Sequence, residues 1–276
     1  MTPVGPPASP GGLSLPRLAG SGPGIGLVLA LLAGLIVTIL AARWSGAISP
    51  AGTLGTMAKW APLIFGGFLL NLLVSVLSMA LGTALGMGLG LAQVSLWSGV
   101  RRAAWLVTQF FRNAPWLVLL FYAMLILPFE VQVFGQRVPL PGWLKSVIGL
   151  SLPVMANVAE IVRGGVQSIP VGQWESAESL AFTRRQILWS IILPQAVKRM
   201  IPPWMNLYAI LTMATSLISI VGVQDGVSLT RAALVAEGRT ELFMPMYLML
   251  LMMFFAYCYP IARLTAALER RFAVKG

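Results

Sequence analysis

Most residues that could engage a partner lie in one polar stretch, residues 163–203. Its cations are Arg163, Arg184, Arg185, Lys198 and Arg199, and its carboxylates are Glu175 and Glu178. The sequence has no histidine, which excludes His-ligated metal sites and Ser-His or Cys-His nucleophile pairs. The stretch can therefore dock a partner, or its charges can serve only topology and solvation; the residue types alone leave both open.

Local signals in residues 163–203 predict two or three short helices set at angles. Pro170 suits a helix start, because its missing N–H is no loss there, and the two carboxylates that follow favour the positive end of that helix. Thr183 with Gln186 fits a capping box, so a second helix is expected near Arg184. Leu193-Pro194 disfavours helix at residue 193, and Pro202-Pro203 should end the stretch.

The composition indicates an all-α integral membrane protein. Of the 276 residues 58% are hydrophobic and 10% charged, with a mean hydropathy of +0.84, whereas soluble domains have roughly 25% charged residues. The formal charge of +11 lies at the ends of apolar runs, which fits a membrane surface and not nucleic acid. The one cysteine, Cys258, allows no intrachain disulfide.

Six apolar segments predict about six transmembrane helices. They lie at 24–42, 63–91, 103–128, 144–162, 202–221 and 242–261. Residues 1–22 read as a disordered tail, 23–43 as an extra N-terminal transmembrane helix, with a cleaved signal peptide as the alternative, and 60–276 as the main transmembrane domain. Residues 129–141 and 222–241 are expected to be polar loops on the far side.

Three details of these segments bear on packing. The glycines of 63–91 let membrane helices approach closely and suit packing against a partner, with a lipid-facing helix in which they are incidental as the alternative. The methionines of 242–261 read as flexible packing and not as a metal site. Arg112 interrupts the third segment and either snorkels to the surface from an amphipathic helix that precedes the true span, the preferred interpretation, or faces a polar interior.

Charge distribution places both termini and residues 163–203 in the cytoplasm. Twelve cations fall on that side and six on the other, with Arg112 unassigned. Such a bias follows the positive-inside rule.

The polar stretch resembles the EAA loop of permease subunits in ATP-binding-cassette importers for polar amino acids. The matching positions are Glu175-Ser176-Ala177, Ala181 and Ile191-Ile192-Leu193-Pro194, flanked by Glu160-Ile161-Val162-Arg163-Gly164-Gly165, Gln173-Trp174 and Pro194-Gln195-Ala196. Ser176 stands for the usual alanine, and Ala181 stands for the glycine that usually turns the chain. A left-handed Ala181 would be strained by about 1–2 kcal/mol, unless the loop turns without positive φ.

The resemblance implies a family core of five helices, to which the first apolar segment is an addition, in a bacterial inner membrane. It implies separate ATPase subunits, a second permease subunit and a substrate-binding protein as partners, with no cofactor in this chain. Met213-Ala214 stand where relatives often carry a charged pair, which favours a heterodimer over a homodimer. The expected ATPase-coupling residues are Gln173, Trp174, Glu175, Ser176, Ala177, Ala181, Leu193 and Pro194.

A translocation path is expected along polar residues of the spans. The candidates are Asn113, Asn157, Glu160, Thr212, Thr215 and Ser216. Glu160 and the hydroxyls have plainer alternatives: Glu160 can pair with Arg163 three residues on, and the hydroxyls can bond back to their own helix.

The predicted function is a transmembrane permease subunit of an ATP-driven amino-acid importer. The chain has no G-x-x-x-x-G-K-[ST] loop to cradle phosphates, so ATP hydrolysis must come from another polypeptide. The alternative is an ion-gradient-driven secondary transporter or channel, which needs intramembrane carboxylates, for which Glu160 is the one candidate. A membrane enzyme is a third possibility that lacks catalytic groups.

Overall fold

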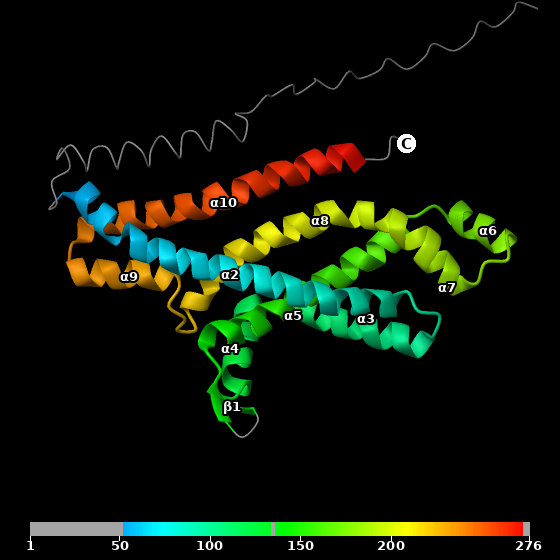
Figure 1. Cartoon of the computed structure of the whole chain (residues 1–276), viewed down its shortest axis with the longest axis horizontal. Coiled ribbons are helices and arrows are strands. Elements are labelled where there is room, and N and C mark those ends of the chain that lie inside the picture. The colour runs from blue at the N-terminus through cyan, green and yellow to red at the C-terminus, as the bar shows by residue number, and fades with distance from the viewer. Residues whose placement is uncertain (1–51, 134–135, 273–276) are drawn as a thin grey trace, which may run out of the picture.

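Two long helices, α2 (Thr53–Gln93) and α5 (Gly142–Gln167), form the centre of the fold (Figure 1). Gly82, Gly86 and Gly90 recur at every fourth residue of α2 and face α5. A Cβ on Gly86 would lie 2.7 Å from Cβ of Val158, so only glycine permits this approach. The expected close approach of helices at these three glycines is confirmed, and the helix that they meet is α5 of the same chain.

This computed structural model describes residues 52–133 and 136–272. The predicted tail (1–22) and N-terminal helix (23–43) lie outside the described residues.

The third apolar segment is two helices and not one, α3 (Ser98–Asn113) and α4 (Trp116–Ile126), with a bend of 103° between them. The break falls at Ala114-Pro115, where Ala114 is extended, the conformation that a following proline favours. The expected loop after α4 holds an antiparallel hairpin, β1 (Glu130–Val133) and β2 (Gln136–Pro139). Buried Lys145 of α5 anchors this region by donating to the Leu127 carbonyl at 3.0 Å.

The elbow, as we name residues 171–192, connects α5 to the next long helix. It comprises α6 (Val171–Ser179), α7 (Arg184–Gln186) and a π-helical stretch η1 (Ile187–Ile192) that runs into α8 (Leu193–Ala214). The prediction of a break at Leu193 is wrong: Leu193 is helical, and Pro194 lies in the first turn of α8, directly after the π-helical stretch. Pro202 and Pro203 likewise lie inside α8 and do not end the stretch.

The C-terminal part wraps the opposite end of α2. A 3-10 helix η2 (Thr215–Ser219) follows α8, and α9 (Gly226–Glu237), η3 (Thr240–Leu242) and α10 (Phe243–Phe272) complete the chain. The prediction of a plain polar loop over 222–241 is wrong, because Asp225 and Ser228 form a capping box that starts α9. Asp225 is fully buried and accepts from Asn71 of α2 at 3.0 Å.

Three described helices are long and apolar enough to cross a membrane: α2, α5 and the helix over 240–271. The bent pair α3 and α4 makes a fourth if it forms one broken span. The fifth expected span, carried by α8, is less apolar because Lys198 and Arg199 lie in its first half. The all-helical membrane fold is confirmed.

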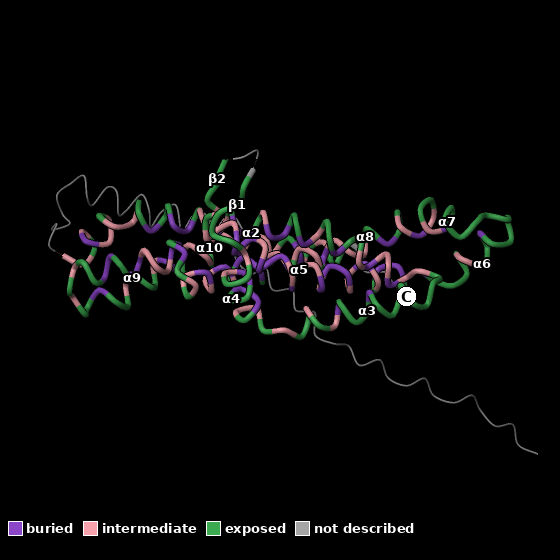
Figure 2. Tube along the Cα trace, turned by 90° about the horizontal axis from the view of Figure 1, so that it is seen from below, coloured by how far each residue is buried: buried purple, intermediate pink, exposed green. Residues whose placement is uncertain are grey.

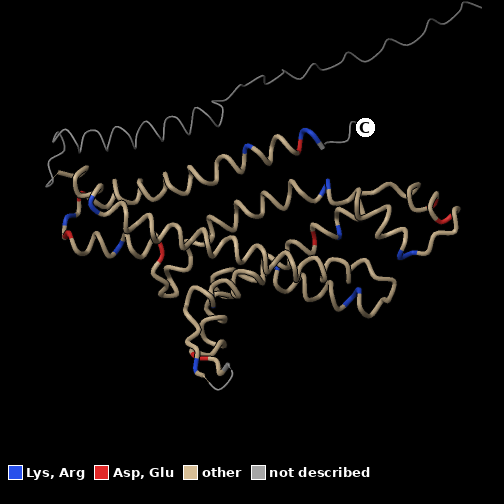
Figure 3. The backbone as a smooth tube through the Cα atoms, in the orientation of Figure 1, with Lys and Arg blue, Asp and Glu red and all other residues tan. Residues whose placement is uncertain are grey.

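Burial varies along the length of the molecule. Charged residues lie at its two ends and at the hairpin, and a further group lies between them on the central helices (Figure 3). Figure 2 shows α6 and α7 standing out mostly exposed at one end, beyond the buried helix centres. The turn between α2 and α3 lies at that same end, where Val94 packs against the elbow.

Candidate functional site

The elbow is anchored by a small apolar cluster of its own. Buried Ala177 of α6 and Ile187 and Ile192 of η1 pack with Val166 and Ile169 at the end of α5. Leu193 and Trp174 are partly buried against the same cluster. The elbow is thus held against the membrane helices and not left as a loose loop.

Two contacts fix the angle between α6 and α7. The guanidinium of Arg184 lies 3.9 Å from the centroid of the Trp174 ring, a cation–π contact, and approaches Glu178 at 3.9 Å. The predicted capping box is confirmed: Thr183 accepts from the Gln186 amide, and Gln186 Oε1 accepts from the Thr183 amide at 2.8 Å.

Ala181 turns the chain between these helices in the left-handed conformation, with φ of 57°. The amide of Ala181 donates to the Glu178 carbonyl at 2.9 Å, and the amide of Phe182 donates to the Ala177 carbonyl at 3.2 Å. This pair of bonds is a Schellman motif, which normally has glycine at this position. Of the two alternatives left open by the sequence, the strained one is realised.

The outer surface of the elbow presents the remaining predicted coupling residues. Glu175, Ser176 and Pro194 are exposed, and within the described residues no side-chain ion pair holds Glu175. Gln173 is exposed and accepts from Gln195 of α8 at 3.5 Å. Among apolar groups Leu180 is 73% exposed and Val171 67%. A rigidly backed surface that exposes apolar side chains beside charges of both signs is suited to docking another protein.

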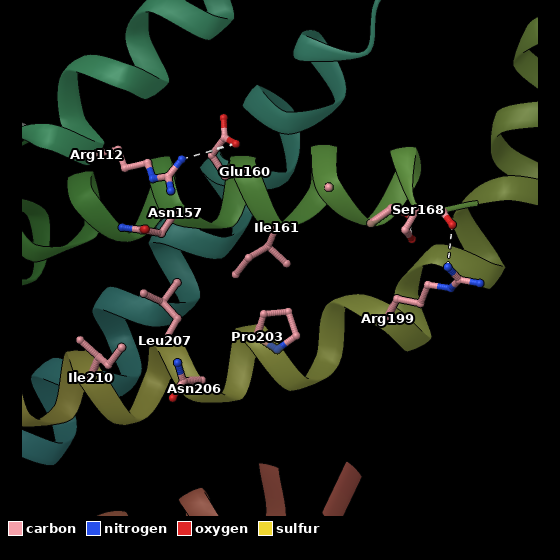
Figure 4. A pocket seen from close by; sticks show the side chains of 12 residues that line it. Arg112, Asn157, Glu160, Ile161, Ser168, Arg199, Pro203, Asn206, Leu207 and Ile210 are labelled. Atoms are coloured by element: carbon pink, nitrogen blue, oxygen red, sulfur yellow. Dashed lines mark hydrogen bonds and ion pairs between the residues drawn. The ribbon is translucent and has the colours of Figure 1, made fainter. Parts of the chain in front are cut away.

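A cavity of about 440 Å³ lies beside the elbow, between α3, α5 and α8 (Figure 4). Its polar lining residues are Arg112, Asn157, Glu160, Ser168, Arg199 and Asn206. Asn157 donates to the Pro153 carbonyl of its own helix at 2.8 Å, so one side of its amide remains available to the cavity.

Glu160 sits between two guanidinium groups. Arg163 donates to it at 2.6 Å, as the plainer alternative predicted, and Arg112 lies 3.6 Å from the same oxygen. Gln109 of α3 also donates to Glu160 at 3.5 Å. Arg112 thus reaches the polar cavity while its side chain stays about half exposed, and both interpretations of this residue, snorkelling and facing a polar interior, stay predictions.

The other predicted path residues do not line this cavity. Thr212 and Thr215 are fully buried, and their hydroxyls donate to the carbonyls of Tyr208 and Thr212. Ser216 bonds the Met213 carbonyl in the same way, and Asn113 bonds the Gln109 carbonyl at the end of α3. The hydroxyls of Thr212, Thr215 and Ser216 thus bond to carbonyls of their own segment, as the plainer alternative predicted.

Three polar residues of the cavity escaped the sequence reasoning, Ser168, Arg199 and Asn206. Arg199 donates to the Ser168 carbonyl at 2.6 Å and so joins α8 to the end of α5. The signal was present, because Arg199, Pro203 and Asn206 recur three to four residues apart and share one face of α8. The sequence analysis overlooked this shared face because it expected the helix to be interrupted at Leu193.

An all-helical membrane chain with a rigid elbow at one end and a polar cavity beside it is built as a transport subunit. The chain belongs to the family of binding-protein-dependent transport system inner membrane components, whose family model matches residues 82–274. It is a permease subunit of an ATP-binding-cassette importer, and ATP hydrolysis lies in a separate subunit. The matches do not support the secondary-transporter alternative.

Two bacterial relatives illustrate the likeness. The chain is 31% identical over 208 residues to the inner membrane amino-acid ABC transporter permease protein YhdY of Escherichia coli, covering 75% of this chain and 56% of that protein's length. It is 34% identical over 212 residues to the probable amino-acid ABC transporter permease protein YckA of Bacillus subtilis, covering 77% of this chain and 90% of that one.

Solved structures of ATP-binding-cassette transporters share the fold of this chain. A crystal structure of an amino acid ABC transporter with histidines matches with a TM-score of 0.67 and 25% identity, covering 78% of this chain and 96% of that one. The MetNI methionine ABC transporter matches with a TM-score of 0.56 at 15% identity, covering 75% and 96%, a likeness of fold alone.

Proposed function

We propose that this chain forms the translocation path of an importer of polar amino acids, together with a second permease subunit. The amino-acid branch is supported by the relatives named above and by the Glu160–Gly165 and Gln173-Trp174 flanks of the elbow. The missing charged pair at Met213-Ala214 favours a heterodimer, in which the partner supplies those charges.

The single observation that carries the proposal is the elbow itself. It projects at one end, keeps a fixed angle through Arg184 and Trp174, and presents Glu175 without an intrachain ion pair among the described residues. The elbow is the docking surface for the ATPase subunits. Their ATP-driven closure moves α6 and α7, and the membrane helices alternate between inward- and outward-open arrangements.

The cavity is the part of the path nearest the elbow. It brings two cations, Arg112 and Arg199, and one carboxylate, Glu160, around one space together with the amides of Asn157 and Asn206. Groups of both signs suit a zwitterion, whose carboxylate and ammonium need opposite partners. In this arrangement Arg112 and Arg163 occupy the Glu160 carboxylate. When the path opens, substrate groups would replace these ion-pair contacts.

The proposed orientation puts the elbow and both termini in the cytoplasm of a bacterial cell, at its inner membrane. The cations at the elbow end support this placement by the positive-inside tendency. A substrate-binding protein delivers the amino acid at the opposite end, where α9 lies.

The test is Glu175→Lys in the complete transporter, purified through this chain and reconstituted in liposomes. The variant is expected to insert normally but to lose co-purifying ATPase subunits, or to retain them without stimulation by substrate and binding protein. Glu130→Lys is the matched control, because it makes the same charge change on the exposed hairpin, far from the elbow. Full coupled ATPase activity of the Glu175 variant would refute the docking role.

A further inference from the structure

Helix α10 is the least covered of the three long described spans. Only 22% of its most apolar 18 residues are buried, compared with 44% for α2 and 72% for α5. Met244, Leu248, Leu251 and Phe255 are all exposed, Met244 by 83% and Leu251 by 58%. They follow one another at intervals of three or four residues and so share one side of the helix. We name these four residues the α10 stripe.

The α10 stripe faces away from the rest of the described chain. Met246 and Leu250 are buried in a cluster with residues of α2 and α9, and the Tyr257 hydroxyl bonds the Tyr208 hydroxyl of α8 at 2.7 Å. At 100° per residue the stripe lies roughly 130° around the helix from these inward residues. Figure 1 shows α10 on the side of α2 and α8 opposite to α3 and α4. A second permease subunit that completes the proposed path at the cavity is therefore on the far side of α8 from the stripe.

The chain carries a further apolar segment, residues 24–42, that matches the α10 stripe in side-chain size. Small side chains recur at every fourth position of this segment, between leucines, isoleucines and valines; they are Gly26, Ala30, Gly34, Thr38 and Ala42. On a helix these five residues share one side. Small residues let a neighbouring membrane helix approach closely, so this side can receive the methionine, leucines and phenylalanine of α10.

The reach of the chain brings this segment to α10. Residues 43–51 connect it to Gly52 at the start of α2 and can extend at most about 30 Å. The start of α2 lies beside the start of α10, because Arg239, just before η3, donates to Thr56 at 3.5 Å. A helix over 24–42 is about 28 Å long, which suffices to cross the hydrocarbon core. From this end of the molecule it runs back antiparallel to α2 and α10.

We propose that residues 24–42 form a membrane helix that packs antiparallel on α10, with its small side chains against the α10 stripe. The added helix would cover the outer side of α10, whose inner side is held by α8 and α9. The exclusion of the second subunit from this stripe rests on the proposed function. The exposure of the stripe, the small-residue pattern and the reach of residues 43–51 are independent of it.

The first measurement is the intact mass of this chain in the purified transporter, because a cleaved signal peptide would remove the segment. A mature chain without residues 24–42 overturns the proposal. For the experiment that follows, Cys258 is replaced by serine, so that the chain has no native cysteine, and a protease site is inserted within 45–50.

The main experiment is disulfide cross-linking of the complete transporter in its membrane. Cysteine at Ala30 or Thr38 is combined in turn with cysteine at Leu248, Leu251 or Phe255. A disulfide keeps the chain at full length on a non-reducing gel after proteolysis. Because the two helices are antiparallel, the partner with the highest yield is expected to shift toward Phe255 when the cysteine moves from Thr38 to Ala30. A shift in the opposite direction overturns the proposed orientation.

Cysteine at Leu32 or Ile36 is the matched control, because these positions lie on the other side of the same helix from the small residues. Combined with the same α10 cysteines, it is expected to release the N-terminal fragment. Equal release from both sides means that lipid or another protein covers the stripe, and a disulfide between two copies of the chain means that the segment packs on another subunit. Either result overturns the proposal.

A second variant tests the close approach itself. Gly34→Leu in the protein with Thr38→Cys and Leu248→Cys places a large side chain between the helices and is expected to lose most of the disulfide. Ile36→Leu on the other side is expected to keep it, and equal yields in the two variants would contradict the packing. These readouts use this chain alone and need no ATP hydrolysis, so they fail separately from the docking role of Glu175.

Discussion

Replacing Ala181 by glycine should stabilise the elbow. Ala181 has φ of 57°, a conformation that costs an L-residue roughly 1–2 kcal/mol. The greater freedom of glycine in the unfolded chain offsets about 0.4–1 kcal/mol of that. The net gain is about 0.8 kcal/mol, which lowers the equilibrium for local opening about four-fold.

The assay is hydrogen–deuterium exchange of the amides over 177–187 in the purified transporter. Those of Ala181 and Phe182 are the sharpest reporters, because they close the Schellman motif. Ser176→Gly is the matched control: it adds the same residue inside α6, where glycine destabilises a helix, and should speed exchange. Unchanged or faster exchange in Ala181→Gly would show that the strain attributed to Ala181 is absent.

Three further predictions follow from other contacts. Thr183→Ala removes half of a capping box and should destabilise the start of α7 by about 1 kcal/mol, seen as faster exchange of the Gln186 amide. Gly86→Val places a side chain against Val158 and should lower the free energy of unfolding of the purified protein by about 1–3 kcal/mol, seen as a lower melting temperature. Gly88→Ala, whose Cβ meets open space, should leave it unchanged. Hydrogen bonds from Lys59 and Trp60 lower the pKa of Glu237, so its carboxylate stabilises the fold above about pH 4.5, and this contribution is lost as the pH falls through the lower folded-state pKa. The difference in the free energy of unfolding between the wild-type protein and Glu237→Gln should therefore shrink over that pH range. A difference that stays constant with pH would contradict this prediction.

Local signals predicted the elbow well because its determinants are neighbours in sequence. The Thr183 capping box and the helix start after Pro170 involve residues within four positions of each other, and both are observed. The apolar runs likewise predicted α2, α5 and α10, since span length depends on composition over one window.

What failed depends on contacts between distant segments. Proline after Leu193 usually ends a helix, but here it occupies a first turn that continues out of a π-helical stretch, which no local rule specifies. The glycines of α2 gave no indication of which helix they meet, and only the fold places α5 against them. Arg112 and Glu160 are 48 residues apart, so their pairing could not be read from spacing.

The continuity of the helix from Arg184 to Ala214 joins the elbow to the cavity. Its elbow end carries the guanidinium stacked on Trp174, and its middle lines the cavity with Arg199 and Asn206. A force on the elbow therefore reaches the cavity wall through hydrogen-bonded backbone and needs no chain of side-chain contacts. The π-helical stretch lies between these two parts, and such stretches mark places where helical register shifts at functional sites. A shift there would also pull on the bond from Arg199 to the Ser168 carbonyl, the link at 2.6 Å that closes the elbow side of the cavity.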